Sequence, residues 1–190
     1  MENSIYLDNN ATTPCDPRVV EKMLPYFSEI YGNPANGYHF QGRNAAKAID
    51  KARGQIAQLI GAQPYEIIFT GGATESNNLA IFGISRFSTN SFRNRLVTSQ
   101  IEHKAVLYPC KVLKEDNKDV IFISVSSEGE INLQELLDSI NEKTLLVSIH
   151  LANNEIGTIQ PIHEIAEYAH SVGAWVHTDA AQAIGKIPIH

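Results

Sequence analysis

A carboxylate directly follows a run of apolar residues near the end of the printed sequence. Asp179 comes after residues 174–178, whose pattern predicts a buried strand. An unpaired carboxylate at the end of a buried strand is costly, so Asp179 needs a cationic partner. Because no Lys or Arg follows before Lys186, a cation on a bound ligand is a candidate partner, and Gln182 would face the same ligand in a helical segment. The alternative is that Asp179 caps the next helix.

Small residues occupy another predicted junction between a strand and a helix. Residues 71–74, with the sequence Gly-Gly-Ala-Thr, lie between a predicted strand at 67–70 and a predicted helix at 75–85. Backbone N–H groups at such a junction can approach a phosphate, and the positive end of the helix dipole adds to the attraction. The alternative is a tight turn in which Thr74 caps the helix. The glycine spacing matches neither the dinucleotide fingerprint nor the Walker loop.

Two further predicted strands also end in polar residues. His103 follows the predicted strand at 96–99, and residues 153–157, Asn-Asn-Glu-Ile-Gly, follow the one at 145–149. A lone histidine is more often structural than functional, and two amides before a glycine usually form a turn. Ligands nevertheless gather at the carboxyl ends of parallel strands, so these side chains would point into one crevice.

Together the four strand ends describe a ligand with a phosphate, a flat ring and a ring cation. Pyridoxal phosphate has all three, and a carboxylate on its pyridinium nitrogen makes the ring an electron sink. A metal site is not expected. His163 and His170 lie seven residues apart on one predicted helix, about 10 Å at about 1.5 Å per residue, which is too far to bind one ion.

The predicted elements place these residues on an α/β fold. From residue 66 onward, strands alternate with helices, which predicts a mostly parallel sheet with helices on both faces. Asn132 is a plausible cap for one of the helices. The predicted strands are 67–70, 96–99, 120–125, 145–149 and 174–178, and the predicted helices are 75–85, 103–113, 133–140 and 162–172.

The front of the chain is organised differently. Asp16 caps a predicted helix that runs to about residue 28, and a longer predicted helix over 42–59 is stopped by a glycine. We therefore divide the chain into a helical arm, residues 1–65, and part of an α/β domain, residues 66–190.

Composition narrows the class of protein. The 190 residues are 43% hydrophobic, and 15 Lys and Arg against 21 Asp and Glu give a net charge of −6, which does not favour binding to nucleic acid or to an anionic membrane. The sequence has neither an apolar run of membrane-spanning length nor the layout of a secretion signal. Two cysteines suit neither a disulfide framework nor a zinc site, so a cytoplasmic location is expected.

The order of the motifs resembles the N-terminal half of cysteine desulfurases, within the class-V aminotransferase-like, fold type I pyridoxal phosphate enzymes. The resemblance covers essentially the whole chain and implies the large domain of that fold, interrupted on its C-terminal side. The motifs that carry it are residues 6–14, 32–34, 70–77, 102–104, 153–157 and 177–182.

The resemblance implies roles for matched residues. Ala73 and Thr74 would hold the cofactor phosphate, and His103 would stack on the pyridine ring and serve as a candidate acid–base group. The family takes sulfur from L-cysteine as an enzyme persulfide, leaves L-alanine, and passes the sulfur to iron–sulfur scaffolds or to tRNA thiolation. It is homodimeric, with cofactor sites near the subunit interface.

Further matches concern the other edge of the ring. Asn154 and Gln182 would reach the phenolic oxygen, and Asp179 would pair with the ring nitrogen. The Schiff-base lysine and the nucleophilic cysteine of the family would both lie beyond His190. We therefore expect this chain to hold most of the cofactor site and neither covalent group.

The two cysteines of the chain do not replace the missing nucleophile. Neither Cys15 nor Cys110 matches the family's sulfur carrier, and Cys110 is expected to pack on a helix as a small hydrophobe. The main hypothesis is half of a cysteine desulfurase that works with a C-terminal half supplied in trans. The alternatives are a non-catalytic remnant of the fold, and a related pyridoxal phosphate lyase such as selenocysteine lyase.

Overall fold

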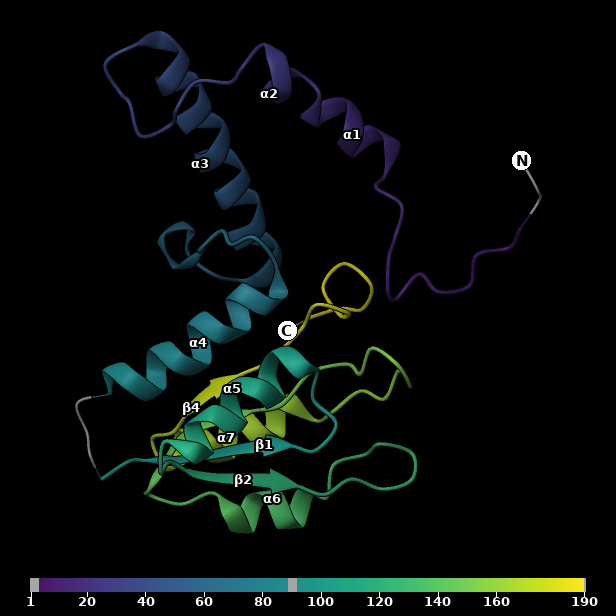
Figure 1. Cartoon of the computed structure of the whole chain (residues 1–190), viewed down its shortest axis with the longest axis vertical. Coiled ribbons are helices and arrows are strands. Elements are labelled where there is room, and N and C mark those ends of the chain that lie inside the picture. Colours follow the sequence, from purple (N-terminus) through teal and green to yellow (C-terminus); the bar gives the residue numbers. More distant parts are fainter. Residues whose placement is uncertain (1–3, 89–91, 190) are drawn as a thin grey trace. The chain divides into compact units, whose positions relative to one another are not determined.

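The chain divides into two compact units. The computed structural model describes residues 4–88 and 92–189. Unit 1 comprises Met1–Phe69 with Ile189–His190, and unit 2 comprises Thr70–Pro188. In Figure 1 unit 1 begins in purple and unit 2 runs from teal to yellow. The contact division therefore falls after Phe69, whereas the domain boundary predicted from the sequence, between residues 65 and 66, stays a prediction.

The described part of unit 1 is helical. Asp16 caps the first helix, because its carboxylate accepts a hydrogen bond of 2.8 Å from the backbone N–H of Arg18. The prediction of one helix as far as residue 28 was wrong, since Pro25 lacks an N–H group and starts a second, shorter helix. The elements are α1 (Pro17–Met23), α2 (Pro25–Ser28), α3 (Phe40–Ile60) and the 3-10 helix η1 (Pro64–Glu66).

Helix α3 is bounded by glycine at its end and fixed by glycine near its start. Gly61 follows it with a φ of 69°, a left-handed conformation that ends the helix as expected. A Cβ atom on Gly42 would lie 1.9 Å from the carbonyl oxygen of Asn36, so only glycine fits there. The buried residues of α3 are small: Gly42, Ala45 and Ala57.

Residues 67–70 do not form the strand that the sequence predicts. No strand partner for this segment occurs among the described residues, and Ile68 is 70% exposed. The segment is held locally instead, because the guanidinium of Arg53 donates to the carbonyl oxygen of Ile67 and lies 4.9 Å from the ring centre of Phe69. A β-rich sequence without a neighbouring strand cannot satisfy its backbone groups as a sheet does, which explains the error.

The remaining predicted strands and helices are confirmed in unit 2, with ends that differ by a few residues. Asn132 caps α6 as predicted, by accepting a hydrogen bond of 3.1 Å from the N–H of Glu135. The elements are α4 (Ala73–Phe87), β1 (Arg95–Ser99), α5 (Lys104–Glu115), β2 (Asp119–Ile123), α6 (Leu133–Ser139), β3 (Thr144–Ser148), α7 (Ile162–Ser171) and β4 (Trp175–His177).

The strands form one parallel sheet in the order β2-β1-β3-β4. The pairing aligns Val97 of β1 with Ile121 on one side and Val147 on the other, and Val147 with Val176 of β4. All four strands therefore point the same way, and their carboxyl ends lie along one edge.

Each face of the sheet is covered by its own apolar core. Leu96 and Val97 point to opposite faces, as neighbouring strand residues must. Leu96 belongs to a core built with α4 and α5, and Val97 to a core built with α6 and α7. Figure 1 shows α5 and α6 on opposite sides of the sheet. The predicted α/β fold with helices on both faces is confirmed.

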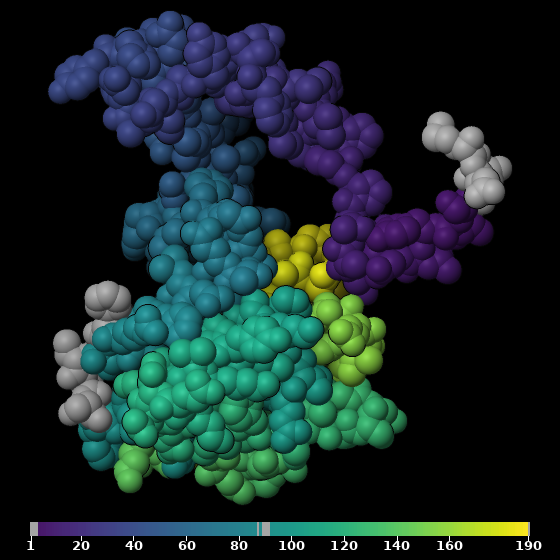
Figure 2. Space-filling view, viewed as in Figure 1, coloured from purple at the N-terminus to yellow at the C-terminus, as the bar shows by residue number. Residues whose placement is uncertain are grey.

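Unit 2 holds the large buried side chains of the described chain. The side chains of Ile81, Leu146 and Ile165 are at most 1% exposed, and each fills a core against the sheet. In Figure 2 the teal and green atoms of this unit form a closely packed body. No helix in the described part of the chain is both long and apolar enough to span a membrane.

A substitution at Leu146 would test how much this packing contributes to the free energy of unfolding. Leu146→Ala removes a side chain that is 1% exposed, between α4, α5 and the sheet, and should lower the free energy of unfolding by about 2–5 kcal/mol. Leu79→Ala is the matched control, because Leu79 is 51% exposed on α4. Urea unfolding followed by circular dichroism measures both variants, and equal losses would contradict this account of the core.

Candidate functional site

The carboxyl edge of the sheet opens between β1 and β3. The chain leaves β1 for α5, which packs on one face, and leaves β3 for α7, which packs on the opposite face. Two neighbouring parallel strands whose following helices diverge leave a crevice between their carboxyl ends, where ligands bind in folds of this kind. The topology therefore predicts a site at this point.

A pocket of about 500 Å³ lies at that point and joins two of the predicted site residues. His103 lines it from the end of β1 and Asn154 from the loop after β3. The His103 side chain also caps α5, because its Nδ1 accepts a hydrogen bond of 3.1 Å from the N–H of Ala105. The histidine thus has a structural role, and its exposed ring still borders the pocket.

Asn153 shapes the wall of the pocket that faces α5. Its side-chain oxygen accepts hydrogen bonds from the N–H groups of Glu155 and Ile156, which forms a turn. Its side-chain nitrogen donates to the carbonyl oxygen of Ile101 over 3.1 Å, which ties this loop to the segment after β1. The turn predicted for residues 153–157 is therefore present, and it forms part of the pocket wall.

Behind the pocket wall, a buried carboxylate joins the ends of β1 and β3. The Glu102 side chain has no exposed surface and accepts a hydrogen bond of 2.6 Å from the hydroxyl of Ser99. The backbone N–H of His150 donates to both carboxylate oxygens, and His150 Nδ1 lies 2.9 Å from Oε1. Four contacts therefore compensate the buried charge and hold the two strand ends together.

Asp179 lies beyond β4 and accepts hydrogen bonds from uncharged donors. Asn77 of α4 donates to Oδ2 over 2.8 Å, and the N–H of Ala181 donates to Oδ1 over 3.0 Å. The backbone of Asp179 also accepts from the N–H of Leu151, which brings the loops after β3 and β4 together. Among the described residues no Lys, Arg or His forms an ion pair with Asp179.

A half-buried histidine lies next to this carboxylate. His177 Nε2 is 3.2 Å from the side-chain oxygen of Asn77, and Nδ1 is 2.8 Å from the hydroxyl of Ser148. Burial lowers the pKa of His177, and this effect outweighs the opposite influence of the Asp179 and Glu102 charges. His177 is therefore neutral at neutral pH.

The glycine-rich junction presents backbone donors at the start of α4. Gly72 occupies the cap position without a side-chain hydrogen bond, so Thr74 does not cap the helix. Ala73 and Thr74 form the exposed first turn, and in the described chain their N–H groups donate to no other residue. The turn is thus open to an external acceptor such as a phosphate.

Gln182 contacts a lysine of its own segment. Its side-chain oxygen accepts a hydrogen bond of 2.5 Å from Lys186, four residues on. The role that the resemblance implies for Gln182 and Asn154 at a phenolic oxygen stays a prediction. Ala73, Thr74, Asn154 and Asp179 likewise keep their predicted roles as predictions.

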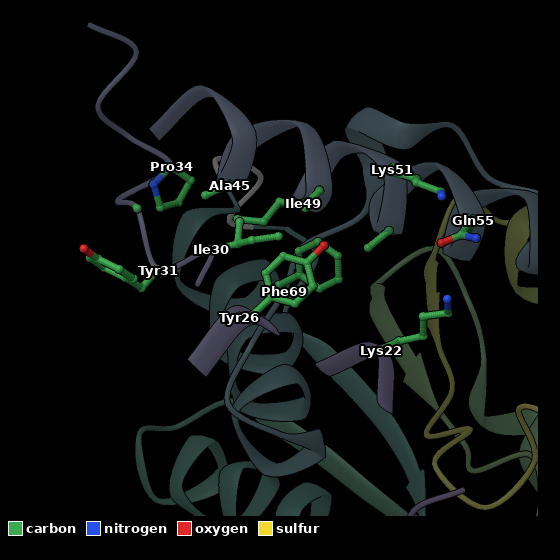
Figure 3. Close-up of a pocket in the computed structure, with 13 residues that line it drawn as sticks. Lys22, Tyr26, Ile30, Tyr31, Pro34, Ala45, Ile49, Lys51, Gln55 and Phe69 are labelled. Carbon is green, nitrogen blue, oxygen red and sulfur yellow. The ribbon is translucent and has the colours of Figure 1, made fainter. Parts of the chain in front are cut away.

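Unit 1 holds a larger and more apolar pocket, of about 880 Å³, between α1, α2 and α3. Figure 3 shows the rings of Tyr26 and Phe69 in its middle, and Lys22 and Lys51 toward one end. None of the predicted site residues lines it. Its character suits packing of further apolar chain better than recognition of a charged small molecule.

Sequence reasoning missed four side chains of this site. Asn77, Glu102 and His177 fall inside motifs that were noted, yet no role was assigned to them, and Ser148 is an inconspicuous strand residue. Glu102 could have been found by the argument used for Asp179, because Glu102 follows the buried strand β1. The contacts of Asn77 could not, since they join segments about one hundred residues apart. The strand before Asp179 was predicted to be buried, and this was wrong, because β4 is partly exposed and Trp175 is 64% exposed.

No cluster of three potential metal ligands occurs in residues 4–88 and 92–189. The residues at the carboxyl edge supply amides, hydroxyls, imidazole rings, carboxylates and backbone N–H groups. Such a set suits an organic ligand with anionic and cationic ends.

Comparison with known proteins agrees with this chemistry. The family model described as Aminotransferase class-V matches residues 5–190. The chain belongs to this family. A mitochondrial cysteine desulfurase from Drosophila melanogaster is 49% identical over 185 residues, which are 97% of this chain and 40% of the relative. The cysteine desulfurase IscS of Rickettsia bellii is also 49% identical over 185 residues, 97% of this chain and 45% of the relative.

Solved structures of this class-V group share the fold. A NifS-like protein superposes with a TM-score of 0.91 and 42% identity, covering 97% of this chain and 51% of that protein. SspA, solved in complex with cysteine, gives a TM-score of 0.92 and 41% identity over 98% of this chain and 53% of its own. The predicted fold type I large domain is thus confirmed, and the chain spans about half the length of these proteins or less.

Cys110 can be tested as a reactive thiol. It is fully buried, and burial with the nearby Glu102 charge raises the pKa of its thiol to about 12. The folded chain should therefore react with iodoacetamide at pH 7.5 only at the exposed Cys15, and Cys110 should react only in urea. Peptide mass spectrometry reads both sites, and rapid labelling of Cys110 in the folded chain would restore it as a candidate sulfur carrier.

Proposed function

We propose that this chain is the part of a pyridoxal phosphate-dependent cysteine desulfurase that cradles the cofactor. The observation that best supports this is the carboxylate of Asp179, which accepts hydrogen bonds from Asn77 and Ala181 and has no cation among the described residues. A carboxylate with this environment suits the protonated nitrogen of a pyridine ring. The relatives named cysteine desulfurase supply the reaction.

The donor set of unit 2 fits the cofactor. The N–H groups of Ala73 and Thr74 would donate hydrogen bonds to its phosphate at the start of α4, and the exposed His103 ring would lie against its pyridine ring. Asn154 in the same pocket as His103, together with Gln182, would contact the phenolic oxygen. Bound pyridoxal phosphate supplies an electron sink for bonds at the substrate's α-carbon.

His103 is placed to move protons in this reaction. Its Nδ1 is fixed as an acceptor by the N–H of Ala105, so the other ring nitrogen is the one that meets ligands. The proposed substrate is L-cysteine and the proposed products are L-alanine and a persulfide sulfur. We also propose the cytoplasm as its location, supported by the free thiols of Cys15 and Cys110.

The covalent groups are proposed to come from a further segment. The relatives are about twice as long as this chain or more, and Cys110 is too deeply buried to serve as a nucleophile. We propose that this second half carries the cofactor lysine and the sulfur-carrying cysteine. The complete enzyme would form a homodimer that hands sulfur to iron–sulfur scaffold proteins or other acceptors.

Cofactor binding tests the proposal. Calorimetric titration with pyridoxal phosphate should show binding to the chain, and Asp179→Asn should weaken it at least tenfold, because the neutral amide loses a charge-assisted contact of about 1.5–3 kcal/mol. Asp138→Asn is the control, since Asp138 is an exposed residue of α6 that pairs with Gln134. Absence of binding to the unchanged chain, or equal binding by both variants, would refute the proposed cofactor site.

Self-association tests the need for a second half. Unit 1 exposes many large apolar side chains, so the isolated chain should elute from a sizing column above its mass of 21.0 kDa. Co-expression with the remaining segment of the Rickettsia bellii relative should give a defined complex that releases sulfide from cysteine. A clean monomer with no affinity for that segment would contradict the proposal. The most exposed of these side chains are Ile5, Leu7, Phe27, Tyr31, Tyr38, Phe40, Tyr65 and Ile68.

A further inference from the structure

A series of hydrogen bonds runs from Ser148, the last residue of the interior strand β3, to the Asp179 carboxylate. It links the Ser148 hydroxyl to His177 Nδ1, His177 Nε2 to the Asn77 oxygen, and the Asn77 nitrogen to Asp179 Oδ2, over 2.8, 3.2 and 2.8 Å. The three residues that lead to Asp179 are Ser148 from β3, His177 from β4 and Asn77 from α4. The contacts therefore tie one helix and two strands to one carboxylate.

The chemistry at the carboxylate end fixes the direction of every donor. Ionised Asp179 only accepts, so Asn77 must present its NH₂ group to Asp179 and its oxygen to His177. That oxygen also only accepts, so His177 must carry a proton on Nε2. A neutral histidine protonated on Nε2 has a lone pair on Nδ1, so Ser148 must donate its hydroxyl hydrogen to it.

We propose that Ser148, His177 and Asn77 are positioning residues that hold Asp179 in place as an acceptor for a ligand cation. The identity of that cation rests on the proposed function. The series of hydrogen bonds is observed independently of it. Asn77 is 4% exposed and its amide is held from both sides, so it cannot rotate without breaking two contacts. Asp179 is in turn held at Oδ2 by Asn77 and at Oδ1 by the Ala181 N–H.

The surroundings of His177 keep its ring neutral, as the donor directions in the series of hydrogen bonds require. Two carboxylates act on it, Asp179 at the end of its own strand and Glu102 at the end of β1, and both favour the charged ring. His150, which lies two residues after the end of β3, has its ring nitrogen Nδ1 against Glu102. Burial outweighs the two carboxylates and lowers the pKa of His177.

This pKa has a consequence for stability. A histidine with a lowered pKa in the folded state binds fewer protons than in the unfolded chain, where its pKa is about 6.5. Its contribution is fully present above pH 6.5 and is lost as the pH falls through and below that value. Protonation also replaces the acceptor lone pair at Nδ1 with a donor, which reverses the required direction at Ser148.

The test measures the pKa of His177 in the chain without cofactor, by deuterium exchange at the ring C2–H followed with mass spectrometry. Asn77→Ala should move the pKa of His177 toward 6.5, because water reaches the ring. Asn77→Asp should raise it further, because a carboxylate oxygen then faces Nε2. Ser148→Ala should also raise it, since the neutral ring loses its donor.

The control is Asn78→Ala, because Asn78 is the neighbouring asparagine of α4 and donates to the carbonyl oxygen of Thr74 instead. It should leave the pKa of His177 unchanged. A purely space-filling role for Asn77 predicts equal shifts for Asn77→Ala and Asn77→Asp, so equal shifts would overturn the proposal. Circular dichroism checks that each variant is folded.

A second measurement separates this proposal from the proposed function. Pyridoxal phosphate should bind Asn77→Ala about tenfold more weakly than Asn78→Ala, as expected for loss of a hydrogen bond to a charged group. If the unchanged chain binds no cofactor but the pKa order holds, the proposed function fails and the positioning proposal stands. If the cofactor binds and the pKa order fails, the positioning proposal is wrong.

Discussion

The two central strands β1 and β3 are buried on both faces, so polar side chains gather near the ends of these strands, and the candidate site of unit 2 depends on this constraint. The core positions of β1 and β3 are apolar, with Leu96 and Leu146 on one face and Val97 and Val147 on the other. Function-bearing groups are therefore displaced to the carboxyl edge, where α5 and α7 diverge. The pocket with His103 lies there because the faces are closed to it.

The same constraint explains why the site is held from several elements at once. Strand ends carry unpaired backbone groups and tend to move unless they are tied. Here Glu102 ties β1 to β3, and Ser148 and His177 tie β3 to β4. Asn77 extends the tie to α4, so the donors at the start of α4 keep their place beside Asp179.

The elements of unit 2 were predictable because their periodic patterns coincide with the packing. The strand β3 is buried throughout and has an apolar centre, and Asn132 and Asp16 cap helices as their types suggest. The failures have local physical causes. Pro25 interrupted a helix whose apolar pattern continues, and residues 67–70 have strand-like composition without a strand to pair with.

The candidate site was predictable only in part. Positions such as His103 and Asp179 follow from strand ends, which a sequence displays, and the motifs carried a family resemblance that the comparisons confirm. The groups that support them do not follow, because hydrogen bonds between Asn77 and Asp179 depend on the fold as a whole. The role predicted for Gln182 stays a prediction, and its contact with Lys186 could not be foreseen from the residue type.

The bond between Glu102 and His150 carries a consequence for how this sequence can change over time. Losing Glu102 leaves Nδ1 of the buried His150 ring without its partner, and losing the His150 side chain removes one of the four contacts that compensate the buried carboxylate, so either loss alone is destabilising. His150 Nε2 already has no hydrogen-bond partner in the described chain, so without Glu102 both ring nitrogens would lack one. Changing both side chains together removes the charge and the ring at once, so the two positions are energetically coupled.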